Sequence, residues 1–296
     1  MIDRKQPPPI VDAVNFNLQL KPYQSYTLRN GVPVYAVNAG AEEVMQLEWV
    51  FFAGNSQEEQ NLVAATTNFL LRNGTNTKTA FQLNEYFEYY GAYVNRACYN
   101  ETATISMHCL SKHVGELLPV VKEMITESTM PSEELAIYQQ NMKQRLKVSL
   151  KKSDFVAGRL IDTYLYGEKH PYGKYSCAED FDALERDQLL QYYNQYYTQG
   201  KLMLFVAGKL PENINLLLDE HFGDLPNHPV EVKEHQIVLA QEKKYRITND
   251  PNGVQGSIRI ARTFPNRHHP DFLKVQVLNA LFGGFFGSRL MSNIRE

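Results

Sequence analysis

The stretch Val44–Thr75 reads VMQLEWVFFAGNSQEEQNLVAATTNFLLRNGT and contains two contrasting local patterns. Its first part, Val44–Gly54, is almost continuously apolar, which predicts a buried β-strand near the centre of a sheet. Its last part, Val63–Thr75, carries apolar side chains near one face and stops at Asn73-Gly74, which predicts a helix followed by a turn. The stretch therefore predicts a fold in which strands and helices pack as layers.

The segments on either side extend this pattern. Two apolar runs, YQSYTL and VPVYAV, flank Asn30-Gly31, which is a strong signal for a β-hairpin. Glu101–Leu110 alternates between apolar and polar residues and Lys201–Gly208 is apolar, so both are predicted strands. Amphipathic segments such as Val114–Glu127 predict long helices between them. We therefore expect a fold of the α+β (α/β) kind, a layered and mostly antiparallel sheet with helices on one face.

The order of these patterns divides the chain into four predicted segments. Residues 1–22 include three consecutive prolines and form an arm, and residues 23–226 form a first repeat. Residues 227–240 are a linker, after which the order of strand, helix and glycine turn recurs in residues 241–296. There KYRIT and VQGSIRIARTF predict two strands, and Asp271–Phe282 predicts a helix. Because this second repeat is short, we expect it to be truncated.

Composition excludes several classes of function. The net charge is -3 and the isoelectric point about 6.3, and no block of Lys or Arg marks a nucleic-acid partner. No run approaches the roughly 18 apolar residues of a membrane span, so no membrane contact is expected. Cys98, Cys109 and Cys177 form no CxxC pair, which favours reduced thiols. Since no signal peptide is evident, we expect a cytoplasmic protein, or a periplasmic one if a leader has been removed.

The usual catalytic and metal-binding motifs are missing from the sequence. His108 and His113 do not share a helical face, and His268-His269 lie in a predicted loop, so neither pair has the spacing of a zinc site. The chain has no GxSxG elbow, no Walker motif and no GxGxxG fingerprint. Gly283-Gly284 precedes two aromatic residues and is predicted to form a backbone turn.

Several separate segments nevertheless resemble one family in the right order. NGVPVYAV, WVFFAGNSQEEQNLVAATTNFLLRNGT, LNEYFEYYGAYVNRACYNETATISMHC and YLYGEKHPYG resemble the insulinase/pitrilysin family, the inverzincins. GGFFGSRLMSNIRE resembles the glycine-rich motif of that family's second repeat, so the resemblance extends from Thr27 to Glu296. It implies repeated metallohydrolase-type units, as in mitochondrial processing peptidase.

Active members of that family carry HxxEH on the helix before the glycine turn. Histidines at positions i and i+4 share a helix face and bind one Zn²⁺, and the glutamate acts as base on the bound water. Alignment on Gly74-Thr75 places the two histidine positions at Ala65 and Phe69 and the glutamate position at Asn68. None of these three side chains can replace the residue that the family has there.

The third zinc ligand of the family is also missing. The resemblance places this glutamate near Gln144 or Arg145, and no acidic residue occurs between Glu134 and Asp154. All the site positions are therefore lost together. We expect no catalytic residue, no metal and no cofactor in this chain, with zinc held by a catalytic partner.

The resemblance implies a non-catalytic subunit or pseudo-enzyme that pairs with an HxxEH-bearing subunit as a heterodimer, or with itself as a homodimer. Such units hold unfolded peptide at a sheet edge by β-augmentation, and Tyr93 and Asn95 fall in the segment next to that edge. Arg295 matches an arginine that helps to hold substrate, although a surface salt bridge is an equal alternative. A structural core-type subunit and an active zinc peptidase with unrecognised ligands remain open alternatives.

Overall fold

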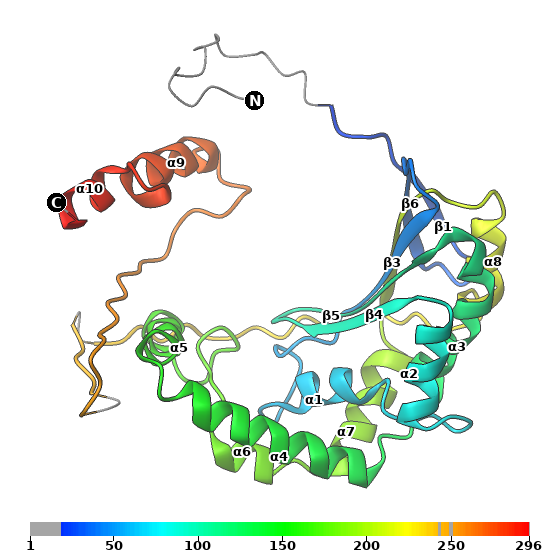
Figure 1. The fold of residues 1–296 in the computed structure, drawn as a ribbon, viewed down its shortest axis with the longest axis horizontal. Coiled ribbons are helices and arrows are strands. Elements are labelled where there is room, and N and C mark those ends of the chain that lie inside the picture. Colours follow the sequence, from blue (N-terminus) through cyan, green and yellow to red (C-terminus); the bar gives the residue numbers. More distant parts are fainter. Residues whose placement is uncertain (1–18, 242–243, 249–250, 296) are drawn as a thin grey trace, which may run out of the picture. The chain divides into compact units, whose positions relative to one another are not determined.

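The computed structural model describes residues 19–241, 244–248 and 251–295, so most of the predicted arm lies outside the described residues (Figure 1). The chain divides into two units. The first joins the described residues up to Asn141 with Ala178–Lys233, and the second joins Met142–Cys177 with the described part of Glu234–Glu296. The predicted repeat boundaries follow the sequence order and remain predictions.

A six-stranded sheet forms the centre of the first unit, in the order β1-β2-β6-β3-β5-β4. Neighbouring strands are antiparallel except for β2 and β6, which are parallel. The predicted hairpin joins β1 to β2, and Gly31 in its turn has a φ of 84°, which glycine adopts without strain. The strands are β1 (Gln24–Thr27), β2 (Pro33–Asn38), β3 (Val44–Phe51), β4 (Tyr93–Cys98), β5 (Ala103–Leu110) and β6 (Leu202–Gly208).

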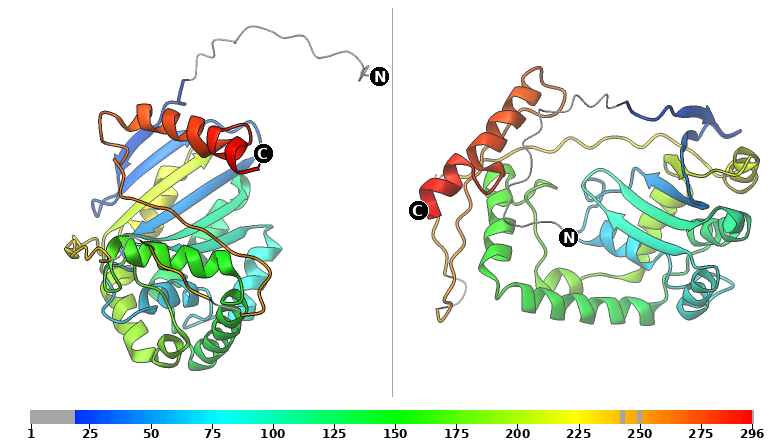
Figure 2. Two further views of the ribbon diagram at one scale, coloured as in Figure 1. Left: turned by 90° about the vertical axis from the view of Figure 1, so that its left-hand side faces the viewer. Right: turned by 45° about the horizontal axis from the view of Figure 1, so that its top comes forward.

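Helices cover one face of this sheet (Figures 1 and 2). Alternate residues of β3 are fully buried, and its Trp49 and Phe51 rings lie 5.4 Å and 4.7 Å from the rings of Phe222 and Tyr197. The fold class expected from the sequence is therefore confirmed. The helical elements of this unit are α1 (Val63–Leu70), α2 (Ala80–Tyr89), η1 (Ser111–His113), α3 (Val114–Thr126), the first part of α4 (Ser132–Ser149), α6 (Ala178–Asp182), α7 (Arg186–Tyr193), η2 (Asn194–Thr198) and α8 (Ile214–Phe222).

The second unit is built on α5 (Ser153–Tyr166), to which the following segment is attached by main-chain hydrogen bonds. The amide nitrogens of Val238 and Ala240 donate to the carbonyl oxygens of Tyr166 and Tyr164, both at 3.0 Å. Farther along the chain lie α9 (Phe272–Asn279), η3 (Ala280–Gly284) and α10 (Arg289–Arg295). The helix predicted for Asp271–Phe282 corresponds to α9 and most of η3. None of the described helices is long and apolar enough to cross a membrane.

The two strands predicted in this unit are wrong. Residues 244–248 and 254–264 contain no strand, and Val254 and Ile260 are 98% and 94% exposed. Alternating apolar residues form a strand only when another strand supplies hydrogen bonds and a surface to cover them. No such partner lies beside these residues in the described part of the unit.

Candidate functional site

Helix α1 begins at a strained residue that a buried carboxylate holds in place. Leu62 has a φ of 75°, which is rare for a residue with a side chain. Glu58 is 8% exposed and accepts hydrogen bonds from the amide nitrogens of Leu62 at 3.3 Å and Ala64 at 2.8 Å. A carboxylate at a helix N-terminus satisfies amides that have no partner within the helix. Glu58 thus fixes the start of α1 and the direction of its faces.

The three predicted site positions lie on two sides of α1. Ala65 is half-buried and Phe69 is 39% exposed, one turn apart. Asn68 is 2% exposed, and its side-chain nitrogen donates to the carbonyl oxygen of Thr104 on β5 at 3.2 Å. The Asn68 amide is therefore a structural link between α1 and the sheet.

These residues do not fit a zinc ion. Ala65 and Phe69 offer no lone pair, and the amide of Asn68 already bonds to a carbonyl oxygen. In the described part of the chain, no group of three or more His, Cys, Asp or Glu residues has a geometry that could hold a metal ion. No chemical step is therefore assigned to a metal at α1.

The Phe69 ring packs between an aromatic ring and a guanidinium. Its centroid is 4.7 Å from the ring of Tyr138 on α4 and 4.8 Å from the guanidinium carbon of Arg96 on β4. A nitrogen of Arg96 donates to the main-chain oxygen of Phe69 and, at 3.2 Å, to the side-chain oxygen of Asn73. A cation–π contact and a charge-assisted hydrogen bond thus join the end of α1 to the edge of the sheet.

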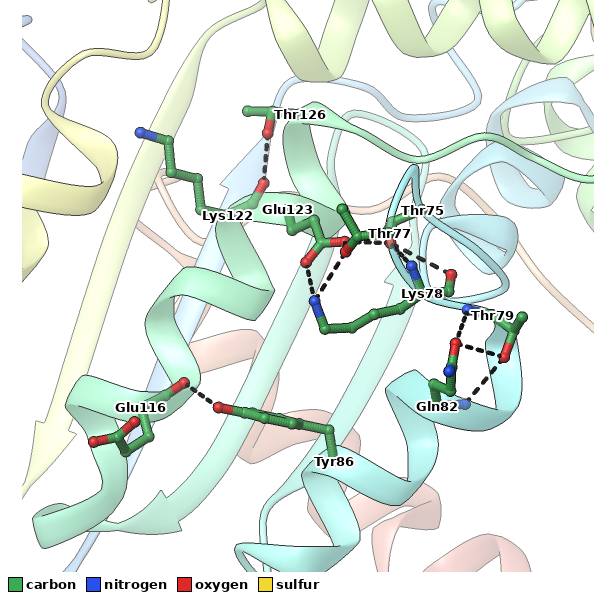
Figure 3. A network of polar contacts seen from close by, with 10 residues as sticks. All are labelled: Thr75, Thr77, Lys78, Thr79, Gln82, Tyr86, Glu116, Lys122, Glu123 and Thr126. Atoms are coloured by element: carbon green, nitrogen blue, oxygen red, sulfur yellow. Dashed lines mark hydrogen bonds and ion pairs between the residues drawn. The ribbon is translucent and has the colours of Figure 1, made fainter.

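The glycine turn after α1 leads into a polar network (Figure 3). Gly74 has a φ of 148°, and a Cβ there would lie 2.9 Å from Pro131. The next residue, Thr75, and Thr77 donate hydrogen bonds to Glu123, which also pairs with Lys78 at 2.6 Å. Burial alone would raise the pKa of Glu123, but the hydrogen bonds from Lys78 and the two threonines more than offset it and lower the pKa.

Strand β4 forms one edge of the sheet. Tyr93 is 64% exposed, Asn95 is exposed as well, and both lie on the face of the sheet opposite the helices. The Tyr93 ring lies 6.2 Å from that of His108, its register partner on β5. The structure thus places the two predicted peptide-binding residues on an edge strand, where an added strand could pair.

Comparison with known proteins indicates similarity to the same family as the sequence motifs do. A family model described as "Peptidase M16 inactive domain" matches residues 183–296. The chain is 23% identical over 275 residues to "Uncharacterized zinc protease YmxG" of Bacillus subtilis, covering 92% of this chain and 66% of that protein. It is also 23% identical over 278 residues to "Probable mitochondrial-processing peptidase subunit beta" of Schizosaccharomyces pombe, covering 88% of this chain and 59% of that protein. The chain is therefore similar to members of the M16 peptidase family.

A solved structure shows that the M16 fold is shared. The crystal structure of a peptidase M16 inactive domain from Pseudomonas fluorescens matches with a TM-score of 0.76 and 24% identity, over 93% of this chain and 68% of that chain. The family model and the curated relatives confirm the predicted resemblance to the insulinase/pitrilysin family, which is the M16 family. The chain spans about two thirds or less of the length of the curated M16 relatives described above.

Two predicted positions of the M16 motif set belong to the second unit. Arg145 lies on the part of α4 that belongs to this unit, and its side chain is exposed, as is that of Gln144. Arg295 is the last residue of α10, and its side chain lies outside the described part of the structure. The positions Ala65, Asn68 and Phe69 belong to the first unit, as does β4.

Arg96 was not predicted from the sequence, although it contacts Phe69, one of the M16 motif positions. Strand β4 alternates, so Val94, Arg96 and Cys98 point toward the helix-covered face. A charged residue at such a position, between Val and Cys, is the signal that could have identified it. No sequence pattern identified Glu58 as the cap of α1, because its contact with the first amides of the helix depends on how the loop before α1 folds.

Proposed function

We propose that this chain is a non-catalytic subunit of an M16 zinc peptidase, which helps to bind an unfolded peptide for a catalytic partner. The partner is an HxxEH-bearing M16 subunit that holds the zinc ion. The observation that carries the proposal is the state of α1. At the three motif positions it has Ala65, Asn68 and Phe69, and the last two are engaged in packing and hydrogen bonding inside the unit.

The edge strand supports a role in peptide binding. An extended peptide can add to an exposed strand through main-chain hydrogen bonds, while the side chains of that strand influence which peptide fits. Tyr93 offers an exposed aromatic ring and Asn95 an exposed amide on β4. An exposed aromatic ring and an exposed amide can contact many kinds of peptide side chain, which suits a subunit that binds unfolded chains.

The comparisons support the assignment of a partner at the level of the family. One of the M16 relatives bears the name of a subunit of a processing peptidase, so a role within a multi-subunit assembly has a precedent among similar proteins. Because the chain spans only part of such relatives, the activity and partners of the whole proteins are proposed here by similarity.

The test combines this chain with an HxxEH-bearing M16 protein from the same organism. We expect a stable complex in size-exclusion chromatography with light scattering, zinc in the partner, and a higher kcat/KM for an unfolded fluorogenic peptide than the partner has alone. A double change of Tyr93→Ala and Asn95→Ala should lower kcat/KM about tenfold or more while the zinc content stays the same.

The matched control is Tyr89→Ala, which removes another exposed tyrosine, 80% accessible on α2, and should leave kcat/KM unchanged. The proposal fails if no complex forms and the partner's activity is unaffected by this chain. It also fails if the purified chain alone binds one zinc ion tightly and shows peptidase activity that a chelator abolishes.

A further inference from the structure

Arg96 occupies an unusual position in the register of the sheet. The paired residues that cross the helix-covered face in this row are otherwise apolar or aromatic, and a charge would be expensive there. The row runs through Tyr26, Val34, Leu204, Trp49, Ile105 and Arg96. Arg96 ends the row at the edge strand, and its guanidinium contacts Phe69 and Asn73 at the end of α1.

A second guanidinium lies beside the first. Arg72, just after α1, donates a hydrogen bond from its side chain to the carbonyl oxygen of Val94 on β4 at 2.8 Å. Burial, and to a smaller extent the charge of Arg72, together lower the pKa of Arg96 to about 9. Burial also lowers the pKa of Arg72, while Tyr93 and Glu88 act in the opposite direction. The two positive groups are therefore close enough to repel each other.

Neither guanidinium has a carboxylate partner. Within the described residues, no Asp or Glu lies within ion-pair distance of Arg72 or Arg96. The Nε atom of Arg96 is buried and has no hydrogen-bond partner. Asn73 accepts a hydrogen bond from Arg96 and donates one to Glu134 at 2.7 Å. The Glu134 carboxylate is therefore linked to Arg96 only through Asn73. A partly buried pair of like charges without a carboxylate in contact is costly unless an anion joins it.

The pair lies beside the free edge of β4. The hairpin between β4 and β5 closes with a hydrogen bond from the amide of Tyr99 to the carbonyl of Thr102 at 2.7 Å. Because main-chain groups alternate in direction along a strand, the polar groups of Val94, Arg96 and Cys98 face away from β5. The bond from Arg72 to the Val94 carbonyl shows that its guanidinium reaches this edge.

We propose that Arg72 and Arg96 together form a binding site for a carboxylate of a peptide that lies along the free edge of β4. Two guanidiniums present planar arrays of donors that match the two oxygens of a carboxylate. The carboxylate belongs either to the C-terminus of the peptide or to an Asp or Glu side chain. This inference rests on the proposed peptide-binding role, and it adds a chemical preference that Tyr93 and Asn95 do not supply.

The test measures binding of three dye-labelled peptides with the same neutral, extended core to the full chain. The first has a free C-terminal carboxylate, the second is amidated, and the third is amidated but contains one internal Glu. Since hydrogen bonds to charged groups are worth more than neutral ones, we expect about tenfold or greater tightening by the carboxylate. A gain for the first peptide alone assigns the site to chain ends, and a gain for the third assigns it to acidic side chains.

Variants identify the groups responsible. Arg72→Gln and Arg96→Gln should each abolish the preference for a carboxylate, whereas Arg259→Gln, which changes an exposed arginine of the second unit, should preserve it. Arg96→Lys keeps the charge but loses the planar array of donors, so it should retain part of the preference. In the wild-type chain, the Nε–H resonance of Arg96 should shift when the free-carboxylate peptide is added, a readout that does not depend on any variant folding.

Two results overturn the inference and differ in what they mean for the proposed function. If all three peptides bind the wild-type chain equally tightly, the carboxylate site is wrong and the peptide-binding role stands. If none of the peptides binds, both the site and the peptide-binding role are wrong. If the Arg72→Gln and Arg96→Gln variants both keep the full preference for a carboxylate-bearing peptide, the carboxylate binds elsewhere on the chain and the inference is wrong.

Discussion

The guanidinium carbon of Arg96 lies 4.8 Å from the centroid of the Phe69 ring, and the same guanidinium donates a hydrogen bond to the main-chain oxygen of Phe69. Phe69 is the position at which the sequence alignment places a zinc-binding histidine of active M16 peptidases. The positively charged side chain of Arg96 therefore contacts Phe69, the residue that stands at the position of a zinc ligand. A cation so close opposes the binding of a second cation.

Restoring the motif alone should not restore a good zinc site. The triple variant A65H/N68E/F69H should bind zinc weakly, because Arg96 keeps its charge beside the new histidine. Adding Arg96→Ala should tighten zinc binding by about tenfold or more, since it removes a charge a few ångströms from the metal. Competition with a chromogenic zinc chelator measures both affinities, and Arg259→Ala added to the triple variant is the control. Equal affinity of the triple and quadruple variants would show that Arg96 has no such effect.

Asn68 should be intolerant of the carboxylate that the M16 motif has at this position. Asn68→Asp keeps the shape of the side chain but loses the donor to the Thr104 carbonyl, and it buries a negative charge at a position that is 2% exposed. We expect a loss of about 3 kcal/mol in the free energy of unfolding at pH 7. Urea unfolding measures the loss.

The pH dependence of this loss identifies its cause. Burial raises the pKa of a carboxyl group, so the folded variant takes up a proton before the unfolded one does as the pH falls. The protonated group can again donate to Thr104, and the difference from wild type should shrink below about pH 5. A loss that is the same at pH 4 and pH 7 would mean that packing, and not charge, is responsible.

Local patterns were enough to predict much of the first unit. The Asn30-Gly31 turn and the apolar run of β3 predicted a hairpin and a central strand, because turn chemistry and apolar character are properties of a few adjacent residues. The insertion of β6 between β2 and β3 could not be predicted, since nothing in Leu202–Gly208 specifies which distant strands it joins. Pairing between distant strands depends on the whole sheet.

The same limit explains the failures. Residues 254–264 have the alternation of a strand, but alternation predicts only what a segment can do when a partner is present. The site positions on α1 came from the family motif, and the structure adds what surrounds them. Arg96 could not be linked to Phe69 from sequence because the two residues lie on different elements that meet only through tertiary packing.

Glu123 should stabilise the turn after α1 in a manner that depends on pH (Figure 3). Glu123→Gln removes the ion pair with Lys78 and weakens the bonds from Thr75 and Thr77, so we expect a loss of about 1–2 kcal/mol at pH 7. The folded pKa of Glu123 is lowered, so its contribution is present above the ordinary value of 4.5 and is lost as the pH falls through the folded pKa.

Thermal unfolding of both proteins at several pH values checks this expectation. The difference between wild type and Glu123→Gln should be constant from pH 6 to 8 and should disappear in acid. As a control, Glu48→Gln changes a carboxylate on the helix-free face and should show no comparable difference. A difference that persists at pH 2 would show that the charge of Glu123 is not what stabilises the turn.

Tyr192 should make the first unit sensitive to alkali. Its side chain is 5% exposed, and its hydroxyl donates to the carbonyl oxygen of Gly54 at 3.0 Å. Burial raises the pKa of Tyr192 far above 10, with smaller contributions from neighbouring groups such as Tyr197 and Cys98. Its stabilising effect is therefore fully present below pH 10 and is lost as the pH rises above that value, because the unfolded state then releases the proton more readily.

Replacement by phenylalanine separates the hydrogen bond from the titration. Tyr192→Phe should cost about 1 kcal/mol at pH 7, through loss of the bond to Gly54, and the difference should decrease between pH 10 and 11 as only the wild type pays for keeping a buried phenol neutral. Urea unfolding at pH 7, 10 and 11 measures the change, and Tyr89→Phe, at an exposed position, should show none. A difference that stays constant over this range would mean that Tyr192 does not titrate with unfolding.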